Sequence, residues 1–560
     1  MKITGAEIIV NELINQGVEI IFGYPGGYVI DIYDALYNNS KNIQHILTAH
    51  EQGAAFAADA YARVSGKVGV VFATGGPGAT NLITGIANAY LDSVPVVFIT
   101  GNVAVPMLGQ DSFQDIDIIG VTLPIVKHSY VVRDVKDLQQ TLTDAFNIAQ
   151  SGRKGPVHID IPKDVQKAAC EYISENINKN VLANNDKNNK HEKLLSKINE
   201  AVQLISNCKQ PYIYCGGGVT ASGTGLEVVN LSKILNAPIG MSMMGIGAVP
   251  SSYELNLGMS GMHGRYASNM AKSEADLIIA LGIRFSDRAT GAASKYSNNT
   301  KIIHIDIDNA EIGKNIYTDV SINGDLKEIL PVLLSKINDI KIETNKDWLN
   351  KVQEYKTKDN QVQNENFSPG NIISTINTFF DEDTIVTTDV GQHQMWTAQY
   401  YGFEKPCTFI SSGGLGAMGY GMGAAIGACF AADKKRTLLI TGDGSFGMNL
   451  TELATAVTNN LPITIILLNN NSLGMVRQWQ TLFFNKHYSN TTLNRKTNFP
   501  TLAKAFGADG ISVSSIVELK KALANSPSDK PYLIECVINI DEQVLPMIPP
   551  GAGVAGMIWK

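Results

Sequence analysis

Several features that would assign the chain to a special class of protein are absent from its sequence. Its six cysteines include no Cys-x-x-Cys pair and are expected to be reduced and structural, as in a cytoplasmic protein. Basic residues are not in excess: 45 Lys and Arg stand against 52 Asp and Glu, and the net charge of −7 argues against nucleic-acid binding. No apolar run approaches membrane-spanning length, and the first residues do not read as a signal peptide. We therefore expect a cytoplasmic protein with no nucleic-acid or membrane partner.

What the sequence does contain is a regular alternation of apolar runs and helical patterns. With 560 residues, of which 44% are hydrophobic, the chain can build several domains with large cores. Such alternation is typical of parallel sheets, so the expected fold class is α/β, with three doubly wound α/β domains and mainly parallel sheets. The expected divisions are an N-terminal domain (1–170), a polar linker (171–193), a central domain (194–340), a charged linker (341–367), a third domain (368–545) and a C-terminal tail (546–560), a candidate lid.

One stretch, Thr437 to Ser472, reads as strand, turn, helix and strand. Two apolar runs enclose a helical pattern, and Gly442-Asp443-Gly444 is a turn signal after the first run. Strands joined in this way run in parallel, so their carboxyl ends lie at one edge of the sheet. Asp443 and Asn470 would meet there. One carboxylate and one amide oxygen suit Mg²⁺, which prefers oxygen ligands and often completes its shell with phosphates.

Glycine-rich segments follow several of the predicted strands. Gly23 to Gly27 would let backbone approach a ligand closely, and Thr74 to Asn81 reads as a helix N-terminus suited to an anion or a tight packing contact. Cys215 to Gly218 is a weak dinucleotide signal, because the full Gly-x-Gly-x-x-Gly pattern is missing. Ser412 to Gly421 is expected to form a glycine-dense helix that packs against a cofactor.

Motifs along nearly the whole chain resemble a single enzyme family. They are His50 to Ala55, Gly75 to Asn81, Asp111 to Asp115, Pro124 to His128, Arg284 to Arg288, Thr388 to Trp396, Met475 to Gln480 and Val544 to Ala552. Together they are similar to the acetohydroxyacid (acetolactate) synthase catalytic subunits, thiamine-diphosphate (ThDP) enzymes, in their flavin-containing biosynthetic branch. Three departures stand out: Ser286 where aspartate is usual, Asp115 where glutamate is usual, and the end from Gly553 to Lys560.

The resemblance implies a ThDP-dependent transferase. It would decarboxylate pyruvate and transfer the two-carbon unit to pyruvate or 2-ketobutyrate, giving 2-acetolactate or 2-aceto-2-hydroxybutyrate. This is the first step of branched-chain amino-acid biosynthesis, of isoleucine and valine. The implied cofactors are ThDP, Mg²⁺ and FAD. The implied partners are the 2-ketoacids, further copies of the chain in a homodimer or tetramer, and a small regulatory subunit.

For the ThDP site, the resemblance implies that Mg²⁺ is bound by Asp443, Asn470 and the backbone oxygen of Ser472. Met418 would prop the cofactor in its bent form, although a lone methionine in plain core is the alternative. The implied ThDP contacts are Pro25, Gly26, Glu51, Val390, Gly391, Gln392, His393, Gly416, Met418, Gly442, Asp443, Gly444, Ser445, Asn470, Ser472, Gly474 and Met475.

Glu51 matches the glutamate that, in this family, hydrogen-bonds the aminopyrimidine ring of ThDP and promotes proton loss from its reactive carbon. A solvated glutamate at a helix start is the alternative. In the family this glutamate and the metal site come from different subunits, so a homodimer would be the minimal active unit.

Arg284 and Trp479 match the site of the second ketoacid. Arg284 could pair bidentately with its carboxylate, and Trp479 would offer a flat apolar wall to an additional methyl group. The alternatives are a surface ion pair of Arg284 with Asp287 or Glu274, and a core anchor in the case of Trp479. Gln114 and Lys127 match further residues of the substrate channel.

The FAD assignment rests on the resemblance, and the flavin would do no redox work in the main reaction. The implied contacts are Arg153, Gly216, Gly217, Met243, Met244, Met262, His263, Gly282, Arg284, Asp306 and Asp325. His263 could equally be a packing histidine.

Two other functions are open from the sequence. One is another ThDP and flavin enzyme such as a pyruvate oxidase, in which the flavin accepts electrons; the Arg284 and Trp479 pair argues against it. The other is an inactive cofactor-binding subunit or regulator, and the presence of Glu51, Asp443 and Asn470 argues against that.

Overall fold

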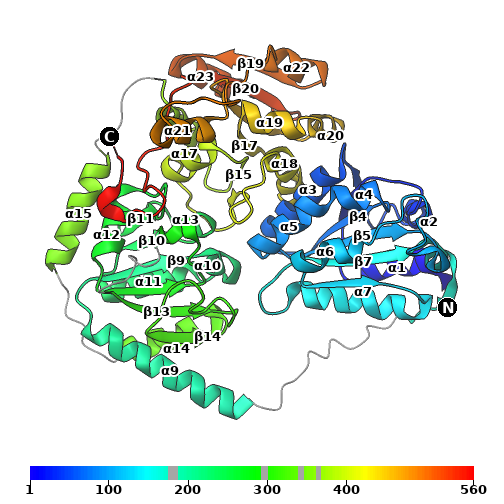
Figure 1. Cartoon of the computed structure of the whole chain (residues 1–560), viewed down its shortest axis with the longest axis horizontal. Coiled ribbons are helices and arrows are strands. Elements are labelled where there is room, and N and C mark those ends of the chain that lie inside the picture. Colours follow the sequence, from blue (N-terminus) through cyan, green and yellow to red (C-terminus); the bar gives the residue numbers. More distant parts are fainter. Residues whose placement is uncertain (174–186, 292–299, 339–345, 361–366, 560) are drawn as a thin grey trace.

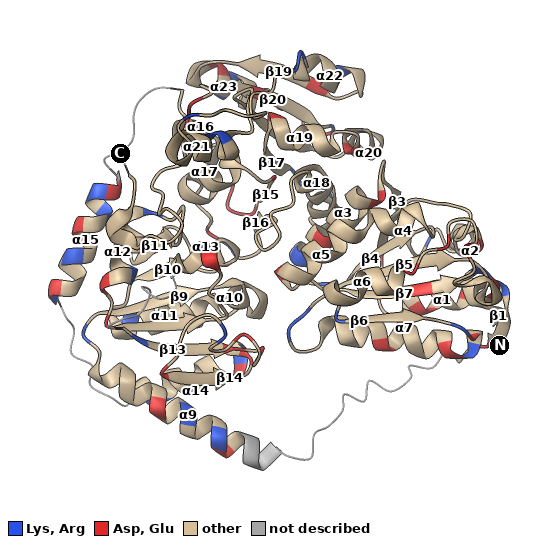
Figure 2. Ribbon diagram, viewed as in Figure 1, with Lys and Arg blue, Asp and Glu red and all other residues tan. Residues whose placement is uncertain are grey.

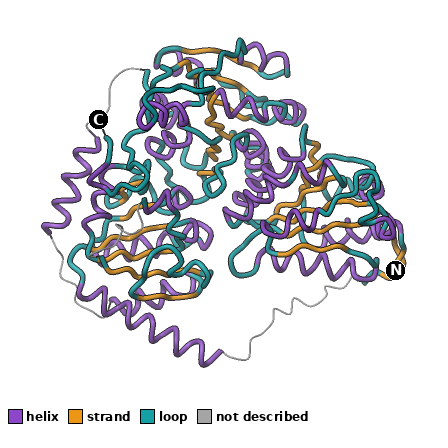
Figure 3. The backbone as a smooth tube through the Cα atoms, in the orientation of Figure 1, coloured by secondary structure: helices purple, strands orange, loops and turns teal. Residues whose placement is uncertain are grey.

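Three parallel β-sheets flanked by helices make up the chain (Figures 1 and 3). The computed structural model describes residues 1–173, 187–291, 300–338, 346–360 and 367–559. Within these residues each of the three sheets has six strands, and a separate antiparallel pair joins β1 (Lys2–Thr4) to β8 (Ala169–Glu171). The neighbouring strands of the three large sheets pair in parallel. The predicted fold class is confirmed.

The first sheet has the strand order β3-β2-β4-β5-β7-β6. Its strands are β2 (Ile20–Gly23), β3 (Gln44–Leu47), β4 (Gly69–Ala73), β5 (Val96–Asn102), β6 (His128–Val131) and β7 (Val157–Pro162). Its helices are α1 (Gly5–Asn15), α2 (Ile30–Asn38), α3 (Glu51–Ser65), α4 (Pro77–Asn81), α5 (Ile83–Asp92), α6 (Ile118–Thr122), α7 (Val135–Gln150) and α8 (Lys163–Lys167). Helix α1 begins with a complete capping box of Thr4 and Glu7, because each side chain satisfies a backbone N–H that the helix leaves free.

The second sheet has the order β11-β10-β9-β12-β13-β14. Its strands are β9 (Pro211–Cys215), β10 (Ile239–Met241), β11 (Asn256–Met259), β12 (Leu277–Leu281), β13 (Lys301–Asp306) and β14 (Val320–Asn323). Its helices are α9 (Lys187–Asn207), α10 (Gly217–Ser222), α11 (Gly225–Leu235), α12 (Tyr266–Glu274), α13 (Asp287–Thr290), α14 (Leu326–Asn338) and α15 (Lys346–Asn360).

The third sheet has the order β16-β15-β17-β18-β20-β19. Its strands are β15 (Ile385–Thr388), β16 (Phe409–Ile410), β17 (Thr437–Gly442), β18 (Ile463–Asn469), β19 (Asp509–Val513) and β20 (Tyr532–Val537). Its helices are α16 (Pro369–Asn377), α17 (Gln392–Tyr400), α18 (Tyr420–Ala431), α19 (Asp443–Asn449), α20 (Glu452–Thr458), α21 (Gly474–Phe483), α22 (Phe499–Ala505) and α23 (Ile516–Ala524). The predicted unit of strand, helix and strand around Asp443 is present, with its helical part divided into α19 and α20.

The expected linker 341–367 contains a helix instead of irregular chain. Helix α15 spans Lys346–Asn360 and carries many charged residues (Figure 2). Trp348, Val352 and Tyr355 recur at helical spacing and are buried, and the Trp348 indole N–H donates to the Pro211 carbonyl at 3.1 Å. These three apolar residues, among many charged ones, were enough to form a packed helix face. Residues 341–345 and 361–366 lie outside the described residues, as do 174–186 of the other expected linker, whose last part belongs to α9.

The expected glycine-dense helix from Ser412 to Gly421 is wrong. Residues 412–419 form a loop, and α18 begins only at Tyr420. Gly416 and Gly419 have φ of +71° and +87°, a left-handed backbone that a helix cannot contain. The glycines therefore serve to turn the chain above the sheet.

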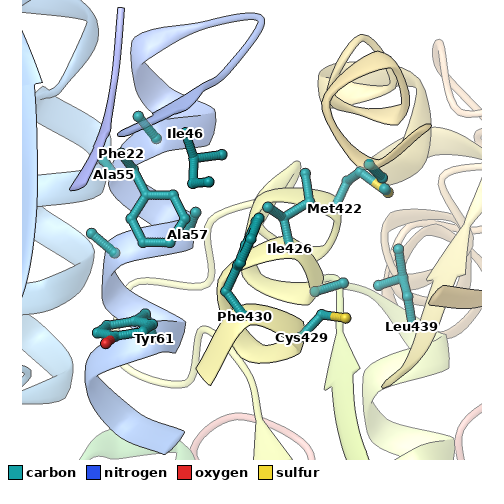
Figure 4. Close-up of a cluster of buried hydrophobic side chains, with 14 of the residues drawn as sticks. Phe22, Ile46, Ala55, Ala57, Tyr61, Met422, Ile426, Cys429, Phe430 and Leu439 are labelled. Atoms are coloured by element: carbon teal, nitrogen blue, oxygen red, sulfur yellow. The ribbon is translucent and has the colours of Figure 1, made fainter. Parts of the chain in front are cut away.

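Helices α3 and α18 join the first domain to the third. Phe22, Ala57 and Tyr61 face Ile426 and Phe430 across the contact (Figure 4), all within one buried cluster. Gly423 allows the close approach, because a Cβ there would lie 2.7 Å from the Gly53 carbonyl oxygen. The position of α3 is thus set by both domains.

The C-terminal tail lies against the central domain. Met547 and Ile558 exchange backbone hydrogen bonds of 2.7 and 2.8 Å, and the Ile548 N–H donates to Met262 at 2.8 Å. The Trp559 ring stacks at 5.0 Å on Tyr266. Across the described part of the chain, the helices are all too short or too polar to cross a membrane.

Candidate functional site

The carboxyl edge of the third sheet collects the residues predicted to bind a metal. Gly442 of β17 is paired with Leu468 of β18, so Asp443 and Asn470 lie just beyond two neighbouring strand ends. Both are buried. Burial raises the pKa of Asp443 to about 6, against the backbone hydrogen bonds and the charge of Arg495. A bound cation would act in the opposite direction and favour the carboxylate.

The metal donors here are oxygens of mixed kind. In the described residues, no group of three or more His, Cys, Asp or Glu side chains is placed to hold a metal. The Asn470 Oδ1 accepts from the Ser472 N–H at 3.1 Å, and this hydrogen bond fixes the orientation of the Asn470 amide. One carboxylate, one amide oxygen and a backbone oxygen are a donor set that fits Mg²⁺ with phosphate and not zinc.

Beside this edge lies a small cradle around His393. A Cβ added to Gly391 or to Gly442 would lie 2.8 Å from an atom of the His393 ring. The Nε2 of the ring is buried and, among the described residues, has no hydrogen-bond partner. Burial lowers the pKa of His393 to about 3, so the ring is neutral at pH 7. In the neutral ring one nitrogen donates to the Asp389 backbone oxygen, so Nε2 is an acceptor, and the donors here that fit a diphosphate are the backbone N–H groups at the start of α17.

Gln392 connects this cradle to the metal edge. Its Oε1 accepts from the Asn470 amide at 3.3 Å, and its Nε2 donates to Gln478 at 3.0 Å. A Cβ on Gly474 would collide with the Gln392 Oε1 and lie 2.6 Å from the Asn470 Nδ2. Glycine at the start of α21 thus leaves room for these two amide side chains, which a larger residue would displace.

The loop 411–419 lies over the same strand ends. The Ser445 hydroxyl donates to the Val390 carbonyl at 2.7 Å, and the Asp389 carboxylate accepts from the Val390 and Gly419 N–H groups at 2.9 and 2.8 Å. A Cβ on Gly444 would lie 3.9 Å from the Met418 methyl carbon. Met418 is partly exposed and faces the edge, so it is not plain core.

A second group of predicted residues gathers at the carboxyl edge of the first sheet. Glu51 is the first residue of α3, is 9% exposed, and accepts from the Asn81 amide at 2.9 Å. A Cβ on Gly78 would lie 3.2 Å from the Glu51 Oε1. This burial excludes the alternative of a solvated glutamate. The Glu51 Oε2 is bound by Asn81, and the Oε1 lies close to Gly78.

Gln114 belongs to this group too. Its Cβ would be 2.7 Å from a Cβ on Gly76, and the adjacent Phe113 carbonyl accepts from the Tyr28 hydroxyl at 2.6 Å. Gly26 packs on Thr74, with 2.5 Å from an added Cβ to the Thr74 Cβ. The loop that contains Pro25 and Gly26, the Gly76 turn and Gln114 therefore lie together with Glu51.

The two arginines of the 284–288 motif have different surroundings. The Arg288 guanidinium lies 5.7 Å over the Trp479 ring, which joins the central domain to α21. Burial lowers the pKa of Arg284, as does the charge of Arg153, while Asp92, Glu311 and Asp306 act against this. Arg284 thus lies near the charges of Arg153, Glu311 and Asp306, and Arg288 lies beside Trp479, the predicted acceptor wall.

Lys127 is engaged within its own domain. Its ammonium donates to the Ile148 carbonyl and, at 2.6 Å, to the Ser151 carbonyl at the end of α7. Burial lowers its pKa. In this structure Lys127 stabilises the free carbonyls of a helix C-terminus, and its predicted role in the channel would require it to leave them.

The predicted flavin residues of the central domain partly converge. A Cβ on Gly216 would collide with the Gly282 carbonyl, and one on Gly217 would lie 3.1 Å from the Met244 Cβ. His263 is buried, and its Nδ1 has no partner among the described residues; burial lowers its pKa to about 4. A buried imidazole nitrogen without a hydrogen-bond partner is unusual for a histidine that only packs in a core. Beside closely approaching backbone, it could instead meet a flat polar ligand.

Three other predicted flavin residues have partners in the chain. Arg153 forms ion pairs with Asp308 at 3.1 Å and Glu311 at 2.9 Å. The Asp306 Oδ1 accepts from the Asp308 N–H, and burial raises the pKa of Asp306 to about 6. The Asp325 carboxylate accepts from the Lys327 N–H at the start of α14. Their flavin roles stay predictions.

Sequence reasoning missed three residues of these sites. Asn81 orients Glu51, Arg288 stacks on Trp479, and Arg495 acts on Asp443 by its charge. Asn81 and Arg288 lie inside the quoted motifs, but only packing shows which member of a motif faces the site. Arg495 follows a loop without any motif, and no signal in the sequence points to it.

Comparisons with known proteins identify the class to which this fold and site belong. Descriptions of thiamine pyrophosphate enzymes match the chain as an N-terminal TPP binding domain (3–121), a central domain (198–333) and a C-terminal TPP binding domain (389–536). The chain is a thiamine pyrophosphate enzyme by domain content, with the ThDP-binding domains at the two ends.

Similarity to named relatives extends over nearly the full length. The acetolactate synthase large subunit of Buchnera aphidicola subsp. Acyrthosiphon pisum is 42% identical over 567 residues, 99% of this chain and 98% of the relative. That of Lactococcus lactis subsp. lactis is 43% identical over 552 residues, 98% and 95% of the two chains. Acetolactate synthase isozyme 3 large subunit of Escherichia coli is 40% identical over 569 residues, 99% and 98%. The chain belongs to the acetolactate synthase large subunit family.

Proposed function

We propose that the chain condenses two 2-ketoacids: two pyruvates give 2-acetolactate and CO₂, and pyruvate with 2-ketobutyrate gives 2-aceto-2-hydroxybutyrate and CO₂. The observation that carries this reading is the Arg288 guanidinium over the Trp479 ring. Trp479 lies on α21, which starts two residues after Ser472 of the proposed metal seat. A cation and a flat apolar wall beside the cofactor edge are what a second substrate with a carboxylate and a short alkyl group requires.

Asp443, Asn470 and the Ser472 backbone oxygen would hold Mg²⁺, and His393 with the Gly391 and Gly442 backbone would bind the diphosphate. Met418 would support the rings from the loop 411–419. When bound, ThDP supplies the carbon that attacks the ketoacid carbonyl and accepts the electrons released with CO₂. Glu51 would hold a proton on the far ring of the cofactor, oriented for this by Asn81.

We infer a homodimer as the minimal active unit. Glu51 and Asp443 lie at the edges of different sheets, and both neighbourhoods expose large apolar side chains. On the first domain these are Tyr24, Ile30, Leu47 and Phe113, the last 80% exposed; on the third they are Leu415, Met448 and Val476. A second copy that laid its third domain on this first domain would cover both sets. We include in this proposal that two dimers can form a tetramer. We also include a small regulatory subunit as a partner, because the relatives are named as large subunits.

We further propose that the cell compartment is the cytoplasm. All six cysteines are free, three of them buried, as expected of a protein kept in a reducing environment.

Replacing Trp479 with leucine is expected to change which acceptor is used. The indole would pack on the additional methylene of 2-ketobutyrate, a contact worth about 1–3 kcal/mol, or roughly 10- to 200-fold in preference. In competition between the two ketoacids, the Trp479→Leu variant should lose most of that preference while pyruvate decarboxylation continues. Equal loss of both products at an unchanged ratio would mean that Trp479 is a structural residue only.

The two arginines can be separated by the same assay. Arg288→Lys keeps the charge but loses the planar fork and the stacking on Trp479, so KM for both acceptors should rise. Arg284→Lys should change flavin retention instead, since its surroundings are those of Arg153, Glu311 and Asp306. If Arg284→Lys raises the acceptor KM and Arg288→Lys does not, the acceptor clamp is Arg284, as first predicted from the sequence.

The flavin is expected to be bound and redox-silent. Gly216, Gly217, Met243, Met244, Met262 and His263 would hold it, with Gly282, Arg284, Asp306, Asp325 and Arg153 around it. A flavin analogue that cannot be reduced should therefore restore acetolactate formation to flavin-free protein. Reduction of one flavin for each pyruvate consumed would favour the oxidase function instead.

The overall proposal is tested by turnover. Purified chain with pyruvate, ThDP, Mg²⁺ and FAD should form acetolactate, and omission of either ThDP or the metal should stop it. No acetolactate from protein that binds ThDP would contradict the proposal.

A further inference from the structure

A buried polar cluster joins the first domain to the cofactor loop. It consists of Asp59 and Arg63 on α3, Asn88 and Asp92 on α5, and Ser412 of the loop 411–419; we call it the interdomain clamp. The side chains of Asp59 and Asp92 are fully buried, and that of Arg63 is 10% exposed. The clamp lies away from the Glu51 end of α3, and none of its members is among the residues predicted to touch a cofactor.

Asp92 binds the loop through its backbone. Its Oδ1 accepts from the Gly414 N–H at 2.7 Å, and its Oδ2 accepts from the Gly413 N–H at 3.2 Å. Arg63 donates to the Asp92 Oδ2 at 2.8 Å and to the Ser411 carbonyl at 3.0 Å. A Cβ on Gly414 would lie 2.7 Å from the Asp92 Oδ1, so this close approach requires glycine. The carboxylate and the guanidinium together hold the backbone of Ser411, Gly413 and Gly414 at the start of the loop.

A second link continues toward the end of the loop. The Ser412 hydroxyl donates to the Asn88 Oδ1 at 2.5 Å and accepts from the Ala417 N–H at 2.9 Å. Asn88 in turn donates to the Asp59 Oδ2 at 3.2 Å. Ala417 directly precedes Met418, so the first domain determines the position of the residue proposed to support the ThDP rings.

Between these attachments the loop itself is open. Residues 413–416 are exposed, and the Gly419 N–H is held from the other side by Asp389. The loop is thus fixed at its two ends by buried charged groups, and its middle, with Gly416, is free to face a ligand. A loop of this composition has high conformational entropy when it is not held.

We propose that Asp92 and Arg63 are positioning residues for ThDP: they hold the loop 411–419 so that Gly416 and Met418 meet the cofactor. The inference rests on the proposed function, because it needs that loop to bind ThDP. Asp59, Asn88 and Ser412 extend the same hold to Ala417. In the proposed homodimer the first domain would therefore serve two cofactor sites: through Glu51 the site on the third domain of the second copy, and through Arg63 the site on its own third domain.

The test compares Asp92→Asn and Ser412→Ala with the parent chain. An asparagine can accept a hydrogen bond from only one of the Gly413 and Gly414 N–H groups, and its own NH₂ then faces the other N–H. The KM for ThDP should rise about tenfold in Asp92→Asn, since a hydrogen bond to a charged group is worth about that factor. Ser412→Ala should show a smaller rise in the same direction. At saturating ThDP the kcat of both variants should return to near the parent value, because the chemistry is untouched.

Glu12→Gln is the matched control. Glu12 is buried in the same domain and joins α1 to α7 by accepting from Gln16 and Thr143, remote from the loop in the fold. The Glu12→Gln substitution should lower the melting temperature without changing the KM for ThDP. The KM for ThDP of Arg63→Lys should lie between those of Asp92→Asn and the parent chain.

An unchanged KM for ThDP in folded Asp92→Asn and Ser412→Ala would overturn the inference. So would equal losses of melting temperature, ThDP affinity and FAD affinity in Asp92→Asn and Glu12→Gln, which would show a structural role only. If Asp92→Asn does not fold, the KM of Ser412→Ala decides. A parent chain that binds no ThDP with Mg²⁺ would mark the failure of the proposed function itself, and that outcome is read before any variant is compared.

Discussion

Asp443→Ala and Asn470→Ala are expected to remove ThDP from the protein. Each variant deletes one side-chain ligand, a carboxylate or an amide, from the proposed Mg²⁺ site at the ends of β17 and β18. Loss of residues that merely support a metal ligand costs about 10–100-fold in metal affinity, so loss of a ligand should cost at least as much. Without the cation, the diphosphate loses its bridge to the sheet. Titration calorimetry with ThDP and Mg²⁺ should therefore show binding weakened by about 100-fold or more.

The neighbouring asparagine offers a control for this result. Asn469 lies one residue before Asn470, but its amide donates to Glu535 at 2.7 Å, on the side of β20. Asn469→Ala should cost some stability and leave ThDP affinity unchanged. ThDP binding of parental strength in folded Asp443→Ala would show that the metal lies elsewhere.

Glu51→Gln is expected to keep the cofactor and slow the reaction by about 10²–10⁴-fold, the usual contribution of a positioned acid or base. Glutamine can still accept from Asn81, so the local structure should survive. An amide cannot stabilise the protonated ring nitrogen of the cofactor as a carboxylate does. The measurement is hydrogen–deuterium exchange at the reactive carbon of bound ThDP, which should slow in parallel with turnover.

Glu452→Gln separates this effect from damage to α3. The Glu452 carboxylate accepts from the Ala49 and His50 N–H groups, just before the start of the helix, and it is fully buried. Its replacement should lower the melting temperature while exchange at the reactive carbon stays fast at saturating ThDP. Slow exchange in Glu452→Gln with normal exchange in Glu51→Gln would remove Glu51 from its proposed role.

Local patterns predicted much of the fold. The apolar runs beside Asp443 became β17 and β18, and the Thr4 and Glu7 pair became a capping box, because both depend on neighbours in sequence. The glycine run before Tyr420 was wrongly predicted to be helical, because small residues are equally suited to a close helix contact and to a left-handed turn. Helix α15 was missed because only three apolar residues in a charged segment carry its packing, and helix α12, on which it packs, is remote in sequence.

The site was predictable as a set of motifs but not as a geometry. Resemblance brought Glu51, Asp443 and Asn470 forward, and the parallel order of β17 and β18 explains why the last two share an edge. It pointed to Arg284 as the carboxylate clamp, whereas Arg288 of the same motif is the one that lies over Trp479, because which of them meets that ring depends on how the central domain packs on α21. The interdomain clamp likewise joins residues about 320 positions apart in the chain.

The proposed reaction condenses two ketoacids without net oxidation. The most direct measurement is the balance of pyruvate, CO₂, acetolactate and oxygen for the purified chain with ThDP, Mg²⁺ and FAD. Two pyruvates should be consumed for each CO₂ and each acetolactate formed, with no oxygen uptake. One oxygen consumed for each CO₂ released, with no acetolactate, would contradict it.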